Sequence, residues 1–251
     1  MIYTDLFFEL VRTDFKMRYH NSILGFFWVL LKPFLIFLII LAVFSWLFNN
    51  QDPFYYLNLL LGILLYSYFA EGTLRGVTCL YDKSSIILKV NFPKVIAVLT
   101  SVANSFISFF AGFMVFLIFW LIGRPIESFS GFGYLILQII ILSILILGLS
   151  FFSSIIYTKL RDLQSIWEVL LQLLFYSTPI FYPITIIPDR FRQLFLLNPL
   201  AVIITESRSA LITGQTYSWQ QSLYALTVVL LLLFLGFWFF QKNVKKVAEN
   251  F

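Results

Sequence analysis

Six long apolar segments constrain this chain of 251 residues more than any other feature. A helix of about 20 residues, rising about 1.5 Å per residue, crosses the roughly 30 Å hydrocarbon core of a membrane. The composition agrees, because 61% of the residues are hydrophobic and only 12% are charged, against about 45–50% and about 25% in soluble domains. The sequence therefore predicts an all-α polytopic membrane protein with six transmembrane helices near Ile23–Phe48, Phe54–Leu74, Val95–Ile122, Phe132–Tyr157, Leu163–Pro183 and Gln221–Phe240.

The distribution of Lys and Arg assigns the two sides of the membrane. Thirteen of the 17 basic residues fall in the N-terminal segment up to Lys32, the Glu71–Lys94 loop, the Thr158–Asp162 loop and the C-terminal tail. The connections on the other side hold the remaining four, namely Arg124, Arg190, Arg192 and Arg208. Because basic residues concentrate in cytoplasmic loops, we expect a multi-pass protein of the bacterial cytoplasmic (inner) membrane with both termini in the cytoplasm. The net charge of +5 then reports orientation and gives no reason to expect a nucleic acid partner.

Residues 1–22 form a separate unit ahead of the six-helix domain, which covers residues 23–251. At 100° per residue, Ile2–Tyr19 places Leu6, Leu10 and other apolar side chains on one face and charged side chains on the other. Such an amphipathic helix lies along the membrane surface, where its apolar face either contacts lipid or docks on a partner protein. Asp14 and Arg18 stand four residues apart, which is the spacing of an ion pair on a helix. Glu71 and Arg75, at the end of the second apolar segment, have the same spacing and are expected to form a local pair.

The Lys-Pro pair at Lys32 and Pro33 interrupts the first apolar segment near its cytoplasmic end. The stem of a lysine can run along a helix and bring the ammonium group to the lipid headgroups. A proline is tolerated near the start of a membrane helix. Both residues are therefore compatible with a first transmembrane helix.

Almost no clusters of titratable side chains, which an enzyme in the membrane would need, occur inside the six apolar segments. The single histidine, His20, and the single cysteine, Cys79, cannot form a His/Cys metal cluster. No GxxxxGK[ST] loop is present, so the chain cannot bind ATP by that route. We therefore expect a protein that is not an enzyme and has no cofactor or metal of its own.

Polar residues inside the apolar segments are candidates for a translocation path. Glu168, Gln172 and Tyr176 follow one another at four-residue steps, and Tyr66 lies inside the second segment. A carboxylate within a membrane indicates function by default, although a shallow position also allows an interfacial role for Glu168. In the third segment, Ser101, Asn104, Ser105, Ser108 and Gly112 share one face, which suits either a helix-packing seam or the lining of a path.

Two connections carry further candidate sites. The Glu71–Lys94 loop combines cations with apolar residues, the makeup of a partner-binding element, and a solvated basic loop is the alternative. Its candidate coupling residues are Ile86, Ile87, Leu88 and Lys89. The long connection before the last segment predicts one short helix from Pro188-Asp189 to Asn198-Pro199 and a second helix running to Thr213-Gly214. These two helices would dip back from the outer face as a gate.

Three stretches of the sequence together resemble a known transporter family. They are DFKMRYHNSILGFFWVLLKP (Asp14–Pro33), LKVNFPK (Leu88–Lys94), and RDL (Arg161–Leu163) followed by STPIFY and LNPLA (Leu197–Ala201). In their order and spacing they are similar to the membrane subunits of type-2 ABC exporters. Specifically, they resemble the Wzm-like permeases that export O-antigen polysaccharide, close to capsule and teichoic-acid permeases.

The resemblance implies a homodimer with two separate ATPase subunits, which bind ATP and Mg²⁺, docked on the cytoplasmic side. It also implies a polyprenyl-pyrophosphate-linked glycan as cargo, an N-terminal interface helix and outer gate helices. Arg18 and Lys32 flank the junction between the interface helix and the first span, where they either recruit the lipid pyrophosphate or anchor the protein. The alternatives for function are a teichoic-acid, lipid or drug-type permease and, from another class, a membrane enzyme of lipid-linked sugar metabolism.

Overall fold

The structure, a computed structural model, describes residues 2–19, 25–48, 52–90, 92–123, 131–213 and 218–250. These residues form ten α-helices, two short 3-10 helices (η1 and η3) and one π-helical turn (η2), and the described residues contain no strand. In chain order the elements are α1 (Ile2–Tyr19), α2 (Phe27–Phe48), α3 (Tyr55–Asp82), α4 (Ser84–Ile87), α5 (Val95–Gly123), α6 (Gly131–Tyr157), α7 (Leu163–Ser177), η1 (Ile184–Ile186), α8 (Asp189–Leu196), α9 (Pro199–Arg208), η2 (Ser209–Thr213), α10 (Trp219–Asn243) and η3 (Val244–Asn250).

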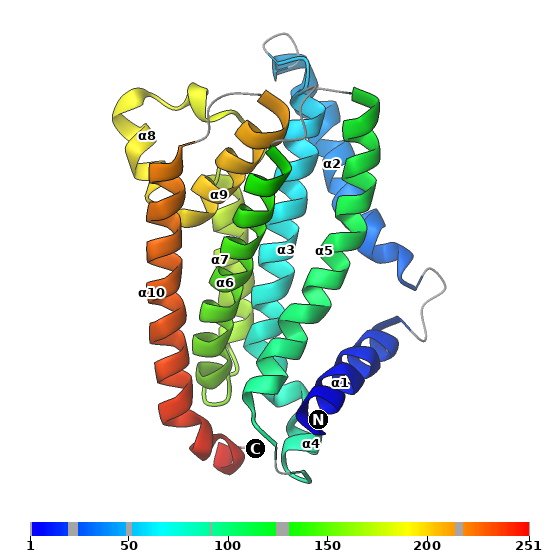
Figure 1. Cartoon of the computed structure of the whole chain (residues 1–251), viewed down its shortest axis with the longest axis vertical. Coiled ribbons are helices and arrows are strands. Elements are labelled where there is room, and N and C mark those ends of the chain that lie inside the picture. The colour runs from blue at the N-terminus through cyan, green and yellow to red at the C-terminus, as the bar shows by residue number, and fades with distance from the viewer. Residues whose placement is uncertain are drawn as a thin grey trace.

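The core of the bundle forms around α3, which packs against α2, α5, α6, α7 and α9 (Figure 1). The helix is apolar on all sides along its middle, as expected for a helix enclosed by others. Its leucines at positions Leu57, Leu59, Leu61 and Leu65 are fully buried. By contrast, α2 lies at the edge of the bundle, and many of its apolar side chains, among them Ile39 and Trp46, are exposed.

The spanning helices agree with the predicted segments, with two differences in length. Five of them (α2, α3, α5, α6 and α10) are long and apolar enough to cross a membrane. The α3 helix continues beyond the expected end at Leu74 as far as Asp82, so part of the predicted loop is helical. The fifth segment is shorter than expected, because α7 ends at Ser177 and the chain then turns through residues 178–183. With its 15 residues α7 is about 22 Å long.

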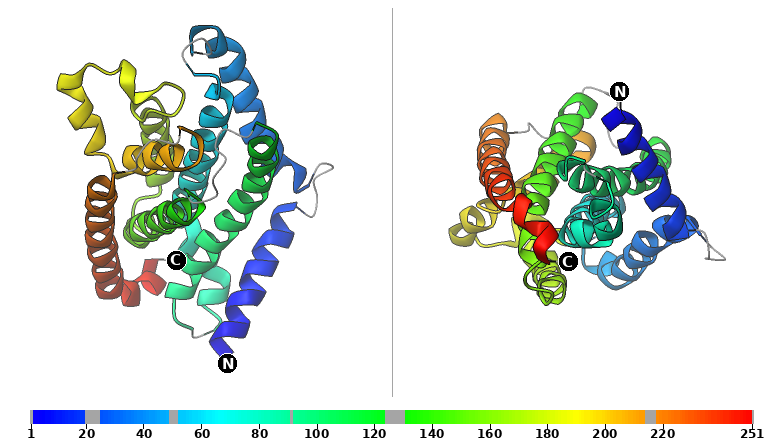
Figure 2. Two further views of the ribbon diagram at one scale, coloured as in Figure 1. Left: turned by 45° about the horizontal axis from the view of Figure 1, so that its top comes forward. Right: turned by 90° about the horizontal axis from the view of Figure 1, so that it is seen from below.

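The bundle has two distinct ends. One, here called the terminal end, holds α1, α4, the α6–α7 connection and η3, so the first and the last described elements lie at the same end of the bundle (Figures 1 and 2). The other end holds the end of α2, the start of α3, and α8. The basic connections predicted from the sequence thus gather at one end of the fold. The expected domain boundary after residue 22, together with His20 and Arg124, lies outside the described residues.

The N-terminal helix is amphipathic, as predicted. Leu10 is buried, and Leu6 and Phe7 pack beside it on a second apolar cluster that includes Ile96 and Val98 of α5. Asp5, Glu9, Arg12 and Lys16 are exposed on the other face. Much of the apolar face of α1 therefore docks on the chain's own α5 (Figure 2). Tyr3, which the helical wheel also assigns to the apolar face, is exposed.

The predicted helix pair between α7 and α10 is present. The α8 helix and the segment that begins at Pro199 meet at 105°. The turn between them is held by Asn198, whose side-chain oxygen accepts a hydrogen bond from the Leu200 amide at 3.0 Å, as an N-cap residue does. Its amide nitrogen donates to the hydroxyl of Thr178 at 3.2 Å. The two helices differ in burial, because α9 is inserted among α3, α6 and α10 while no residue of α8 is buried.

Candidate functional site

A cavity of about 840 Å³ lies between α1, α2, α3, α5 and α7, within the size range of small-molecule sites. Apolar side chains such as Trp28, Ile36, Leu74 and Phe175 form much of its wall. Its charged lining residues, four cations and four anions, come from four helices and the residue that follows α3: Asp14, Arg18, Lys32, Glu71, Arg75, Asp82, Lys83 and Glu168. We call it the charged cavity. Its mixture of apolar wall and ionic groups suits a ligand that is itself amphipathic.

Glu71 is the central anion of the charged cavity. One oxygen of its carboxylate accepts hydrogen bonds from the guanidinium group of Arg18 and from the hydroxyl of Ser108 at 3.2 Å, and it forms an ion pair with Arg75 at 2.9 Å. The Glu71–Arg75 pair was expected from its four-residue spacing. The contact with Arg18 joins the last turn of α1 to α3, so the interface helix is held on the bundle by a shared carboxylate.

The predicted ion pair between Asp14 and Arg18 is wrong. Asp14 instead pairs with Lys83, with 2.7 Å between Oδ2 and Nζ, and Arg18 pairs with Glu71. The reason is the burial of Lys83, whose side chain is only 6% exposed, because a buried ammonium group without a partner is costly. When α1 docks on the bundle, Asp14 and Arg18 therefore pair with residues of the bundle and not with each other.

Several predicted site residues meet in this one cavity. Arg18 and Lys32, the proposed entrance pair, both line it, and so do Tyr66 and Glu168 of the proposed path. Gln172 and Tyr176 are not among its lining residues; both are exposed on α7. The hydroxyl of Tyr66 donates to the Leu171 carbonyl oxygen, so this side chain also fixes α7 against α3.

The small polar stripe of α5 lies partly in a helix contact and partly on the charged cavity, and its role in a translocation path stays a prediction. Ser101, Ser108 and Gly112 line the charged cavity. Asn104 and Ser105 are buried where α5 packs on its neighbours, and a Cβ atom at Gly112 would stand 2.7 Å from a methyl group of Leu64 on α3. The stripe is therefore a packing seam that opens onto the cavity.

The candidate coupling residues lie at the terminal end, around α4. Leu88 is 59% exposed, and Lys89 is exposed beside it. Ile87 is only 8% exposed and belongs to the same apolar cluster as Leu10, with Ile86 packed against that cluster. Leu88 and Lys89 are thus the two of the four that a partner could reach readily, while Ile87 stabilises the chain itself.

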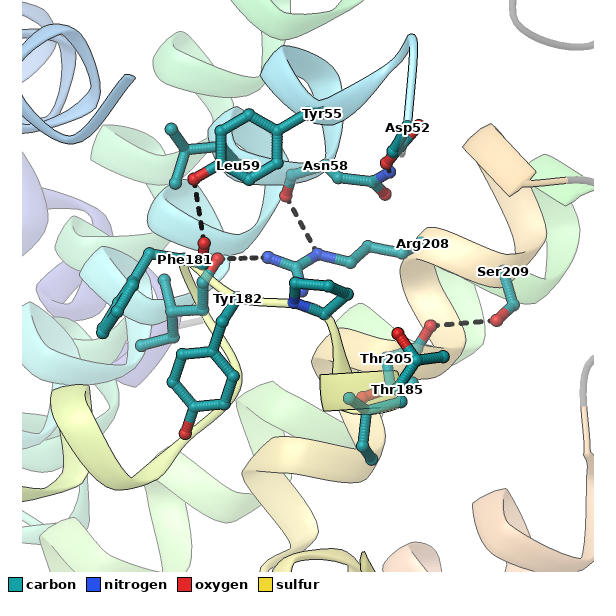
Figure 3. Close-up of a pocket in the computed structure, with 13 residues that line it drawn as sticks. Asp52, Tyr55, Asn58, Leu59, Phe181, Tyr182, Thr185, Thr205, Arg208 and Ser209 are labelled. Atoms are coloured by element: carbon teal, nitrogen blue, oxygen red, sulfur yellow. Dashed lines mark hydrogen bonds between the residues drawn. The ribbon is translucent and has the colours of Figure 1, made fainter. Parts of the chain in front are cut away.

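At the opposite end, a second pocket of about 160 Å³ is built around Arg208 (Figure 3). The guanidinium group donates to the carbonyl oxygens of Asn58 at 2.9 Å, of Pro179 at 2.7 Å, and of Ile180. Tyr55 adds a hydrogen bond of 2.8 Å to the Phe181 carbonyl oxygen. Arg208 therefore ties the turn after α7 to the start of α3.

The four proposed gate residues lie around α8, near this pocket. Pro188 and Asp189 begin α8, and Asn198 and Pro199 begin α9. Asp189 makes an exposed ion pair with Arg192 at 2.9 Å. These positions bound the two helices as predicted, and their role as a gate stays a prediction.

A buried polar network, which sequence reasoning missed, attaches α9 to α6 and α10. The carboxylate of Glu206, on a residue only 4% exposed, accepts hydrogen bonds of 2.8 Å from the hydroxyl of Tyr134 and from the Ser218 amide. Ser222 bonds in turn to Tyr134 and Gln138. The sequence offered one signal, a carboxylate within an apolar stretch, but its partners are distant in the chain.

The acidic, histidine and cysteine side chains of the described residues do not gather into a candidate metal site. In this described part of the chain, no three His, Cys, Asp or Glu side chains stand close enough together to hold a metal ion. Two ion pairs instead connect α1 with α3 and the residue that follows it, namely Arg18–Glu71 and Asp14–Lys83. This arrangement suits a site that binds a charged ligand and can change shape around it.

Comparison with known proteins gives consistent matches over almost the whole chain. Residues 5–212 match the model of the family described as "ABC-2 type transporter". The chain is 28% identical to the O-antigen export system permease protein RfbA of Klebsiella pneumoniae (98% of this chain, 94% of the relative) and 27% identical to its namesake in Myxococcus xanthus (99% and 96%). It is 26% identical to the polysialic acid transport protein KpsM of Escherichia coli, over 92% and 89%. The chain therefore belongs to the ABC-2 type transporter family.

Proposed function

We propose that this chain is the membrane subunit of an ABC transporter that exports a polysaccharide, carried on a polyprenyl pyrophosphate, across the bacterial cytoplasmic membrane. The names of its relatives support export of a surface glycan, and their similarity extends over both chains almost completely. The basic terminal end faces the cytoplasm in this proposal, in line with the positive-inside distribution of its loops.

The charged cavity is the observation that carries this proposal. A pyrophosphate lipid combines an anionic headgroup with an apolar chain, and the cavity combines Arg18, Lys32 and Arg75 with walls that include Trp28 and Phe175. Arginine can bind phosphate through two parallel hydrogen bonds. A cation near an anionic headgroup contributes on the order of 1 kcal/mol at a membrane surface. We assign the cavity as the site where the headgroup enters.

The proposal includes two copies of this chain and two ATPase subunits, which supply the energy. The ABC-2 family implies an ABC ATPase partner, and exposed Leu88 and Lys89 next to α4 offer it a contact at the terminal end. The second copy of the chain would cover apolar side chains that α7 exposes, among them Val169 and Leu173. The glycan would then pass between the two copies and leave past α8 and α9.

The test uses the complete complex with its ATPase in lipid nanodiscs. We expect the polyprenyl-pyrophosphate-linked glycan to stimulate ATP hydrolysis and the same glycan without its lipid to do so weakly. The double variant Arg18→Gln/Lys32→Gln should lose most of this stimulation. The matched control is Arg12→Gln/Lys16→Gln, which removes two exposed charges from α1 that do not line the cavity. Equal stimulation in all three proteins, with topology checked, would contradict the proposal.

A further inference from the structure

The carboxylate of Glu71 occupies the position in which the charged cavity could hold an anionic ligand. It lies between two guanidinium groups from different helices, Arg18 of α1 and Arg75 of α3, and both side chains remain partly exposed, at 37% and 25%. A phosphate group forms the same charge-assisted hydrogen bonds with arginine as a carboxylate does. The anionic group of an incoming ligand would therefore compete with Glu71 for these two arginines.

The surroundings of Glu71 allow it to leave this position. Its carboxylate lines a cavity of about 840 Å³ and also bonds to the hydroxyl of Ser108 at 3.2 Å, which could hold the carboxylate after displacement. The α1 helix would keep a second ion pair to the end of α3, Asp14–Lys83, at 2.7 Å. Release of Glu71 from Arg18 would thus loosen one end of α1 without detaching the helix.

We propose that Arg18 and Arg75 form a binding site for the diphosphate headgroup of a lipid, and that Glu71 fills this site in the resting subunit and is displaced when the headgroup binds. This inference rests on the proposed function, because it takes its ligand from the proposed cargo. It adds Arg75 as a ligand-binding residue and Glu71 as an internal competitor. Displacement of Glu71 would link headgroup entry to movement of α1, which lies at the terminal end together with α4.

A direct binding measurement tests the inference on the full complex in nanodiscs. The probe is geranylgeranyl pyrophosphate, with geranylgeraniol and inorganic pyrophosphate as comparators, and the fluorescence of Trp28 in the cavity wall contributes the signal. The variant Glu71→Gln removes the competitor and should tighten binding of the lipid diphosphate about tenfold. The reason is that the apparent affinity of a site falls in proportion to the fraction of molecules in which the site is open, and Glu71 occupies it in most wild-type molecules. Binding of geranylgeraniol should not change.

The matched control is Asp82→Asn. Asp82 lines the same cavity, and its carboxylate accepts a hydrogen bond from Thr78 instead of holding a guanidinium group. Its removal changes the charge of the cavity by the same amount without freeing an arginine, so the affinity should stay within about twofold of the wild type. An equal gain in both variants would show a general charge effect and would overturn the competitor role.

Further outcomes separate this inference from the proposed function. If Glu71→Gln binds the lipid diphosphate no more tightly than the wild type, Glu71 is not a competitor, whether or not the glycan still stimulates ATP hydrolysis. Should that variant fail to fold, Arg75→Gln keeps the test open, since it must weaken binding of the lipid diphosphate several-fold. Unchanged binding of the lipid diphosphate to Arg75→Gln would refute the proposed binding site. Inorganic pyrophosphate binding as tightly as the lipid would overturn the assignment to a lipid headgroup.

Discussion

The hydroxyl of Tyr134 on α6 donates a hydrogen bond of 2.8 Å to the carboxylate of Glu206 on α9. This contact places an ionisable group in the interior of the bundle, where an unpaired charge would be costly. The Ser218 amide is the second donor to the same oxygen. Together they attach the inserted helix α9 to its neighbours at the end opposite the termini.

Removal of the Tyr134 hydroxyl should destabilise the attachment of α9. We expect Tyr134→Phe to lower the free energy of unfolding by about 1–3 kcal/mol, because the buried carboxylate of Glu206 loses one of its two donors. Tyr224→Phe is the control, because its exposed hydroxyl bonds only to the Leu197 carbonyl oxygen and should matter by less than about 1 kcal/mol. Titration with sodium dodecyl sulfate measures both, and equal losses would argue against a special role for Glu206.

Close contact between α6 and α10 depends on two glycines. A Cβ atom at Gly236 would overlap the carbonyl oxygen of Gly148, and small residues are what allow membrane helices to approach closely. We therefore expect Gly236→Ala to cost about 1–3 kcal/mol of stability in the same titration. Gly133→Ala provides the comparison, since nothing lies within 4 Å of a Cβ atom there. Comparable stability of the two variants would contradict the packing described.

The geometry of the Arg208 side chain, beyond its charge, should be needed for the turn after α7. Its guanidinium group donates to three carbonyl oxygens, and a lysine cannot reproduce this planar fork. Arg208→Lys should lose about 2 kcal/mol or more and expose residues 178–185 to protease. Arg192→Lys, in an exposed ion pair on α8, should lose less than about 1 kcal/mol. Protection of the turn in Arg208→Lys would refute the assignment.

The exposed part of the α4 region should couple the subunit to its ATPase. We expect Leu88→Ser to insert and fold normally but to lower glycan-stimulated ATP hydrolysis several-fold, because Leu88 is 59% exposed at the terminal end. Leu223→Ser changes a leucine that is also exposed, at 65%, near the start of α10, and should leave coupling intact. Full stimulation of ATP hydrolysis in Leu88→Ser would show that the ATPase contacts another part of the chain.

Much of the fold could be predicted from the sequence, because the hydrocarbon core of a membrane requires each spanning helix to be about 20 residues long and mostly apolar. The α2 helix, with Lys32 and Pro33 near its start, and the helix pair α8–α9 agree with their predictions. The end of α7 at Ser177 was not predicted, although Pro179 and Pro183 disfavour the interior of a helix there. An apolar run has similar hydrophobicity whether it is helical or, as at residues 178–183, folded into a turn. Hydrophobicity gave no signal that distinguishes the two.

The sequence predicted only those contacts of the candidate site that form within one helix. Spacing along one helix anticipated the Glu71–Arg75 pair, whereas the Asp14–Lys83 and Arg18–Glu71 pairs join residues far apart in the chain. No periodicity in the sequence carries that information, since these pairs depend on where α1 docks. The network around Glu206 was missed for the same cause: its partners belong to α6 and α10.

Transport by the complete complex tests the central claim most directly. The measurement uses inverted membrane vesicles that contain this chain and its ATPase, given radiolabelled polyprenyl-pyrophosphate-linked glycan on the outside, and follows the glycan that becomes protected in the lumen. We predict uptake that requires ATP, that falls by about tenfold or more in Arg18→Gln/Lys32→Gln, and that Arg12→Gln/Lys16→Gln retains. Absence of ATP-dependent uptake in a correctly inserted complex, or full uptake by the cavity variant, would contradict the account.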